Sequence, residues 1–357
     1  MFKFECYKLF KRKSIWVVLG LFLLYAALTV SEIYFNEFPA NYAITNVGET
    51  LVGNEGLQYN KNRIEKYKGV LTNELIEEVL QSYKETESIN HVTLYFENFR
   101  LENQTHITVE NAYPYATSAL TYGFSAGWET FLRKRLQIMT VFPLILMVLF
   151  CPLFPYEYQC GMSSVLLTTK NGKIKSAKAK ILIAFIITNI TFLVVTGLQA
   201  LLYYIRYGIE GYDTSIQVGL YNYFNLSALS FNYLDLSLNT LFLNLLGINM
   251  ILLIIIGVSI KSYNSIQSLL ISVLLCYSFS PELISRIFSN MTAFYVISLH
   301  PINSLDTKNI ACLDYVDFLG RENAWINFLQ IFYIVLIGLG LFYVCKVMVK
   351  KQKYYSD

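Results

Sequence analysis

Six long stretches without any Asp, Glu, Lys or Arg constrain this chain more than any other feature. They span residues 14–31, 136–156, 181–205, 236–260, 262–281 and 323–345. The hydrocarbon core of a bilayer is about 30 Å thick, and a helix needs about 20 mostly apolar residues to cross it. Charged residues make up only 15% of the chain, against about 25% in ordinary soluble domains. The pattern predicts an all-α polytopic membrane protein with six transmembrane helices.

The charges between these runs indicate how the chain is oriented. With the N-terminus in the cytosol, the cytosolic segments are 1–13, 157–180, residue 261 and 346–357. They hold 15 of the 28 Lys and Arg residues but only 3 of the 25 Asp and Glu residues. Cytosolic loops of membrane proteins carry an excess of Lys and Arg. We therefore expect both termini to be cytosolic, although a basic cluster at 133–135 falls on the opposite side.

This orientation divides the chain into alternating spans and loops. In chain order, we expect an amphipathic cytosolic helix at 1–13, a span at 14–34, an extracytoplasmic domain at 35–135, a span at 136–156, a cytosolic loop at 157–180, a span at 181–205, an outer loop at 206–235, spans at 236–260 and 262–281, an outer or re-entrant segment at 282–322, a span at 323–345 and a cytosolic tail at 346–357. The fifth span is the weakest because polar residues crowd its start. The second helix should bend or break near 152–155, where Pro152 and Pro155 stand.

The large extracytoplasmic segment reads as a small mixed α/β domain. Residues 32–135 contain 14 Glu and no Asp. Apolar residues recur at helical spacing between Leu75 and Tyr83, and Thr72 or Asn73 can cap that helix. The short β-branched and aromatic stretches at 91–96 and 105–109 predict one or two strands.

Motifs for chemistry on this chain are absent. The Gly172-Lys173 pair lacks the earlier glycine and the following Ser or Thr of a P-loop, so the chain has no ATP site of that kind. The three histidines are scattered, at positions 91, 106 and 300, and a metal site would need several ligands at close spacing. We expect no catalytic residue, no cofactor and no metal on this chain, and no nucleic acid among its partners.

The lysine-rich loop carries the one recognisable signature. Glu157 is followed four residues later by Gly161, then by Leu166-Leu167, Thr168-Thr169 and Gly172-Lys173, and the loop ends on Lys180 at the next span. This order resembles the permease subunits of ABC-2 type transporters, in which a carboxylate and a glycine close the second span and a short loop ending in Gly-Arg or Gly-Lys precedes the third. Met162 stands where that family often has Thr, and Lys173 where Arg is common.

The resemblance extends to the predicted layout, including the large outer segment found in the sodium- and peptide-export branches. It implies a non-catalytic transport subunit of a bacterial plasma membrane, which pairs with a second permease chain. A separate cytosolic ATPase would hold ATP and Mg²⁺ and would bind the 157–180 loop. The cargo expected is a peptide, an antibiotic or another amphipathic molecule. The residues expected to couple the two proteins are Glu157, Gly161, Leu166, Leu167, Thr169, Gly172, Lys173 and Lys180.

Two other interpretations stay open at this point. Glu157 can serve merely as a helix cap or as the ion-pair partner of a nearby lysine, with the lysines only fixing topology. The chain can also be a membrane sensor or immunity protein that transports nothing. Its acidic outer domain would then bind a cationic ligand.

Overall fold

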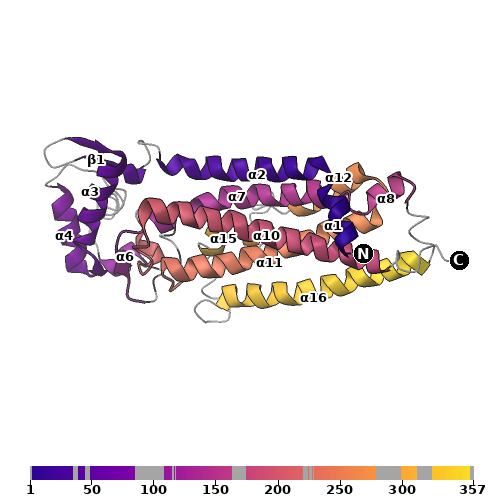
Figure 1. Ribbon diagram of the computed structural model, residues 1–357. Coiled ribbons are helices and arrows are strands. Elements are labelled where there is room, and N and C mark those ends of the chain that lie inside the picture. The colour runs from indigo at the N-terminus through magenta and orange to yellow at the C-terminus, as the bar shows by residue number, and fades with distance from the viewer. Residues whose placement is uncertain are drawn as a thin grey trace.

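Long helices that run side by side dominate the molecule (Figure 1). The computed structural model describes residues 2–34, 39–44, 49–84, 108–114, 116, 118–162, 174–219, 224, 227, 229–278, 299–311 and 324–353. A small lobe lies at one end of the helix bundle, on the left in Figure 1, and both chain termini lie at the other. We call these the lobe end and the terminal end.

Five helices are long and apolar enough to cross a membrane. They are α2 (Lys13–Ser31), α7 (Ala126–Phe150), α10 (Ile174–Tyr207), α11 (Tyr233–Lys261) and α16 (Ala324–Lys353). Each contains all or most of one of the charge-free runs, and α7 ends at Phe150, before the end of the run at 136–156. The architecture therefore fits the multi-pass membrane protein that the sequence predicts.

The fifth charge-free run forms a shorter helix than expected. Helix α12 (Ser265–Tyr277) has 13 residues, and a helix of that length spans only about 20 Å at 1.5 Å per residue. The last residues of the run, 279–281, lie outside the described part of the chain. A span at 262–281 therefore stays a prediction.

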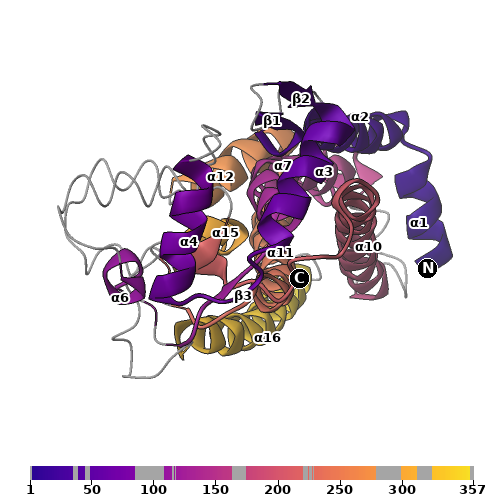
Figure 2. The same cartoon turned by 90° about the vertical axis from the view of Figure 1, so that its left-hand side faces the viewer.

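Helix α11 is the centre of the bundle. It packs against α7, α10, α12 and α16, and Figure 2 looks at this arrangement from the lobe end. Helices α2 and α16 are the least buried of the five. Large apolar side chains such as Leu21 and Phe342 are exposed on them, as expected for surfaces that face lipid tails.

Several helices extend beyond the charge-free runs. Helix α7 begins at Ala126 rather than at residue 136, so the end of the predicted extracytoplasmic domain belongs to the bundle. Two cations of the 133–135 cluster are buried there with polar partners. Lys134 pairs with Glu32, and Arg135 Nε donates a 2.9 Å hydrogen bond to Asn244 Oδ1. These contacts allow charged residues to remain helical inside the bundle.

The lobe consists of short helices and two small antiparallel sheets. Its elements are η2 (Pro39–Asn41), β1 (Tyr42–Ile44), β2 (Thr50–Val52), α3 (Gly53–Glu65), β3 (Gly69–Val70), α4 (Asn73–Lys84), α6 (Val109–Ala112) and β4 (Thr121–Tyr122). Strand β1 pairs with β2, and β3 pairs with β4. The lobe thus contains both helices and strands, as the sequence predicts for this segment.

The predicted helix of the lobe is confirmed, whereas the predicted strands fall almost wholly outside the described residues. Ile76, Val79 and Leu80 are buried on α4, and Thr72 Oγ1 accepts a hydrogen bond from the Leu75 N–H as an N-cap does. The stretch 91–96 lies outside the described residues, as does most of 105–109. Thr108, in the second stretch, caps α6.

One segment near the C-terminal helix folds back into the bundle. Residues 299–311 carry η4 (Asn303–Leu305) and α15 (Thr307–Ala311), and both contact α7 and α11. The Asn244 side chain donates a 2.6 Å hydrogen bond to the Ser304 carbonyl. The other residues of the predicted 282–322 segment lie outside the described part of the chain.

Candidate functional site

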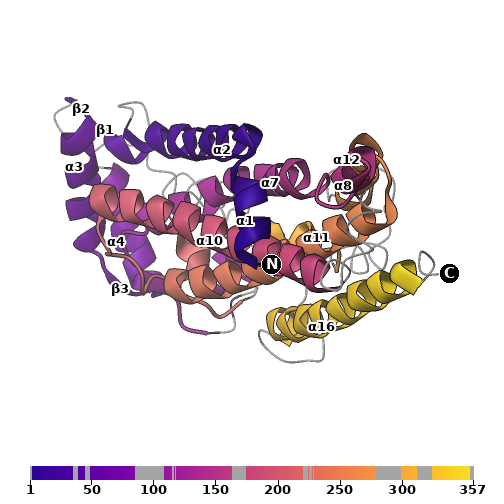
Figure 3. The same ribbon diagram turned by 45° about the vertical axis from the view of Figure 1, so that its right-hand side comes forward.

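The helix that enters the lysine-rich loop is broken, as the two prolines predict. Helix α7 ends at Phe150, and after four residues α8 (Pro155–Gln159) begins in a new direction. Pro155 occupies the first turn of α8, where its missing N–H costs nothing. Ser259 of α11 holds the turn by donating to the Cys151 carbonyl at 2.9 Å and accepting from the Phe154 N–H at 3.3 Å. Figure 3 shows α8 beside α12 at the terminal end.

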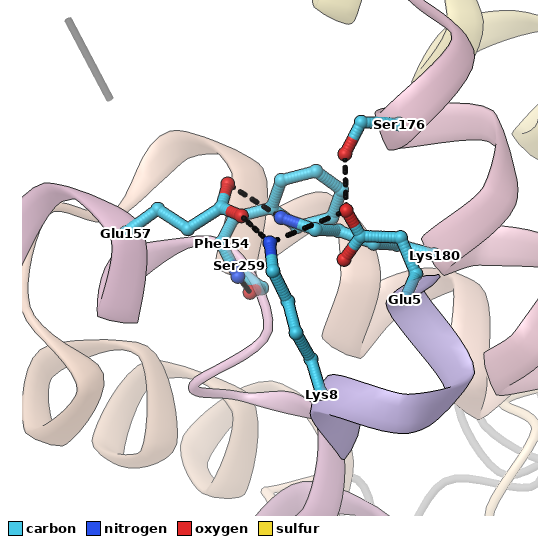
Figure 4. A network of polar contacts seen from close by, with 7 residues as sticks. All are labelled: Glu5, Lys8, Phe154, Glu157, Ser176, Lys180 and Ser259. Atoms are coloured by element: carbon cyan, nitrogen blue, oxygen red, sulfur yellow. Dashed lines mark hydrogen bonds and ion pairs between the residues drawn. The ribbon is translucent and has the colours of Figure 1, made fainter. Parts of the chain in front are cut away.

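Glu157 of α8 stands in a network of four alternating charges (Figure 4). One of its carboxylate oxygens lies 2.5 Å from Lys180 Nζ of α10, and the other lies 3.7 Å from Lys8 Nζ of α1 (Phe2–Phe10). Lys8 also lies 3.4 Å from Glu5, which accepts a 2.8 Å hydrogen bond from the Ser176 hydroxyl. The network therefore ties together three elements that are far apart in the sequence.

Burial makes this network sensitive to the loss of any one charge. Glu5 and Lys180 are almost fully buried, at 4% and 5% exposure, while Glu157 and Lys8 keep some contact with solvent. The Lys180 ammonium also lies 5.1 Å from the centre of the Phe154 ring, a cation–π contact. Two carboxylates balance two ammonium groups, so removing one group leaves a buried charge without compensation.

The opposite side of α8 is attached to the turn between α11 and α12. Gln159 donates a 3.2 Å hydrogen bond to Asn264 Oδ1 and accepts one of 2.9 Å from the Ser265 hydroxyl. The ring of Tyr158 packs edge-on against that of Tyr263 at 5.4 Å between centres. Helix α8 therefore links α1 and α10 on one side to the α11–α12 turn and the start of α12 on the other.

Gly161 ends this short helix. Its φ angle is +67°, a left-handed conformation that glycine adopts without the strain other residues incur. Its N–H donates a 3.1 Å hydrogen bond to the Tyr158 carbonyl, a contact typical of a helix C-terminus. No atom lies within 4 Å of the position a β-carbon would take, so the backbone conformation, not space, selects glycine here.

A cavity of about 390 Å³ lies beside the network. Its walls come from α1, the turn before α8, α8 itself and the start of α10. Lys8, Glu157 and Lys180 line it together with two further cations, Lys11 and Arg12. The Arg12 guanidinium lies 4.2 Å from the centre of the Tyr156 ring.

The structure brings some of the predicted site residues together. Glu157 and Lys180 form the closest ion pair of the network, and Gly161 ends the helix that carries Glu157. The other predicted residues, Leu166, Leu167, Thr169, Gly172 and Lys173, lie outside the described part of the chain. Glu157 thus pairs with a nearby lysine, and its role in coupling to an ATPase stays a prediction.

Sequence reasoning missed three members of the network, namely Glu5, Lys8 and Ser176. A signal for the first two was present. Glu5 is the only acid in residues 1–13, and Lys8 follows it at the spacing of neighbours on one helix face. Ser176 has no comparable pattern, because only the approach of α1 to α10 makes its hydroxyl a partner for Glu5.

The site offers fixed charges and a cavity, which suit binding and mechanical attachment. In the described residues, no three His, Cys, Asp or Glu side chains gather as metal ligands would.

No protein-family model matches the chain, and no curated protein matches it either.

Proposed function

We propose that this chain is the membrane permease subunit of an ATP-driven exporter of the ABC-2 type. The observation that carries the proposal is the position of Glu157. It sits on a short helix at the terminal end of the bundle, and that helix is attached to α1, α10 and the start of α12. A cytosolic ATPase that pushes or pulls on α8 would act on all three at once.

The chemistry of α8 supports a role in passing on movement. A helix of five residues has little stability of its own, so its place is set by the contacts of Glu157, Tyr158 and Gln159. Ion pairs and amide hydrogen bonds have defined directions, unlike apolar contacts. Displacement of α8 would therefore shift α10 and α12 along definite axes. The terminal end would face the cytosol, in keeping with its excess of lysine.

An apolar cavity at the lobe end supports an amphipathic cargo. This cavity, of about 220 Å³, is lined by Trp128 and Phe131 of α7 and by Ala200, Tyr203 and Tyr204 of α10. Such a lining suits the apolar part of a ligand. A lipid-like molecule or the apolar face of a peptide could enter from the lateral surface, where Tyr204 is exposed.

Co-expression with the ATPases encoded near its gene tests the proposal. We expect one of them to co-purify with the chain and to hydrolyse ATP faster in its presence. Glu157→Gln should reduce that stimulation about tenfold, because a charge-assisted hydrogen bond contributes about 1.5–3 kcal/mol. Glu157→Asp, which keeps the charge, should retain part of it.

Lys178→Gln is the matched control for this experiment. Lys178 lies two residues before Lys180 but is exposed, so its loss should leave the stimulation unchanged. Failure of every neighbouring ATPase to bind the chain would remove the transporter proposal. Full stimulation in Glu157→Gln would remove only the role of that residue.

One observation favours the sensor as a second candidate. Helix α4 exposes Glu74, Glu77 and Glu78 on one face of the lobe. If this face binds a cationic peptide, the full-length chain should bind it more weakly as ionic strength rises. Substituting the three residues by Gln should abolish binding while leaving ATPase stimulation intact.

A further inference from the structure

Two cations of the cavity beside α8 have no acidic partner among the residues that the structure describes. Lys8 and Lys180 are paired with Glu5 and Glu157, as described above. Lys11 and Arg12 line the same cavity, and in the described part of the chain no carboxylate lies within ion-pair distance of either. The cavity therefore contains four cations against two acids, and the excess positive charge lies on the α1 side.

Arg12 is held in a conformation that leaves its donors available. Its guanidinium stacks on the ring of Tyr156 at 4.2 Å, and a stacked guanidinium still presents N–H groups along its edges. Lys11 lies 5.6 Å from the centre of the Tyr7 ring and is exposed. A planar fork of donors beside a flexible ammonium group is a good receptor for phosphate oxygens.

Part of the cavity wall around these cations is apolar. Helix α1 lies across the long helices at the terminal end of the bundle (Figures 1 and 3). Phe4 and Tyr7, which line the cavity, are 54% and 62% exposed. Leu9, Leu153, Met162 and Ile183 also belong to the apolar part of its wall. A short helix with exposed aromatic rings and lysines is suited to the interface between lipid headgroups and acyl chains.

We propose that the cavity between α1 and α8 binds the phosphate of an anionic lipid headgroup. Arg12 and Lys11 hold the phosphate oxygens, and the apolar wall accommodates the start of the acyl chains. Lys8 and Lys180 add to the positive potential but stay engaged with Glu5 and Glu157. The same phosphate chemistry is offered by soluble phosphate esters. The exposed aromatic rings favour the lipid, because a soluble anion would gain nothing from them.

The experiment measures binding of a headgroup-labelled phosphatidylglycerol to the full chain in nanodiscs of zwitterionic lipid. The test variant combines Lys11→Gln with Arg12→Gln. The control variant combines Lys3→Gln with Lys13→Gln, which removes the same charge from exposed positions that do not line the cavity. Each basic residue near a membrane surface contributes about 1 kcal/mol of attraction to anionic lipid.

We expect the test variant to bind the lipid about tenfold more weakly than the control variant. Equal binding by the two variants would overturn the site, because it would show that only the overall charge of the N-terminal segment matters. Thermal unfolding of both variants shows whether the test variant is folded, and Arg12→Lys provides a milder substitution that keeps the charge. Arg12→Lys should bind the lipid at an intermediate level.

A competition arm distinguishes the two sources of phosphate. Inorganic phosphate and glycerol 1-phosphate are added to the chain in detergent together with the labelled lipid. We expect neither to displace the lipid at millimolar concentration. Displacement by either compound would overturn the lipid in favour of a soluble phosphate ligand.

Discussion

Glu157 holds α8 against α1 and α10 at the terminal end through its two ion pairs. Two ammonium groups share its carboxylate, and one of them, on Lys180, is almost fully buried. A buried ion pair is weak evidence for stability, because desolvation offsets much of the attraction. Its value lies in holding α8 in one position relative to α1 and α10.

A double-mutant cycle measures how strongly the two residues depend on each other. Glu157→Gln should lower the free energy of unfolding by about 3 kcal/mol, because it leaves Lys180 buried without its closest partner. Adding Lys180→Met should restore part of that loss, since no buried charge then remains unbalanced. Denaturant unfolding of the four proteins in detergent gives the coupling energy. Strictly additive losses would show that the ion pair contributes nothing.

Residue chemistry could be predicted from the sequence only where a local pattern exists. Glu157 and Gly161 stood out because each is unusual in its segment. The contact between Glu5 and Ser176 could not be predicted, because it joins α1 to α10. Contacts between distant segments leave no trace in a single sequence.

At the scale of the elements, the length of α8 is set by the residue that ends it. The left-handed conformation of Gly161 stops the helix directly after its last turn. This conformation determines the direction in which the chain leaves toward the lysine-rich loop. A side chain at this position would favour a right-handed continuation of the helix.

Gly161→Ala should destabilise the protein by about 1 kcal/mol, because alanine is strained at positive φ. Gly197→Ala is the matched control. Gly197 lies inside α10, and no atom lies within 4 Å of its would-be β-carbon either. Alanine there should be neutral or stabilising by up to about 1 kcal/mol. The two thermal unfolding midpoints should therefore move apart, and a common shift would contradict this explanation of Gly161.

The helices themselves were easier to predict than their ends. A charge-free run marks the part of a helix that suits the hydrocarbon core, and five such runs lie wholly or mostly within long helices. The ends extend further wherever a charged side chain finds a partner. Lys134 stays in α7 because Glu32 neutralises it, and Lys180 stays in α10 because Glu157 does. Ion pairs of this kind cannot be predicted from the amino-acid composition of a segment.

At the scale of the whole molecule, the lobe and α8 lie at opposite ends (Figure 1). If the long helices cross the membrane, these two ends must face different compartments. Cys160, an exposed thiol directly after α8, and Glu78, an exposed position on α4, are suitable reporters of the two sides.

A membrane-impermeant thiol reagent tests this arrangement. In intact cells we expect a Glu78→Cys variant to react and Cys160 to stay protected. In inverted vesicles the pattern should reverse. Cys160→Ser is the control for background labelling of the remaining cysteines. Labelling of both positions from one side would rule out the arrangement of the spans.

The central position of α11 also affects the order in which the protein can be assembled. Asn189 of α10 and Asn249 of α11 exchange two amide hydrogen bonds of 3.0 Å. During synthesis α10 leaves the ribosome first, and until α11 follows, the Asn189 amide can donate only to the Phe185 carbonyl of its own helix. An unpaired amide is costly in lipid. We therefore expect newly inserted α10 to be less stable in the membrane until α11 joins it.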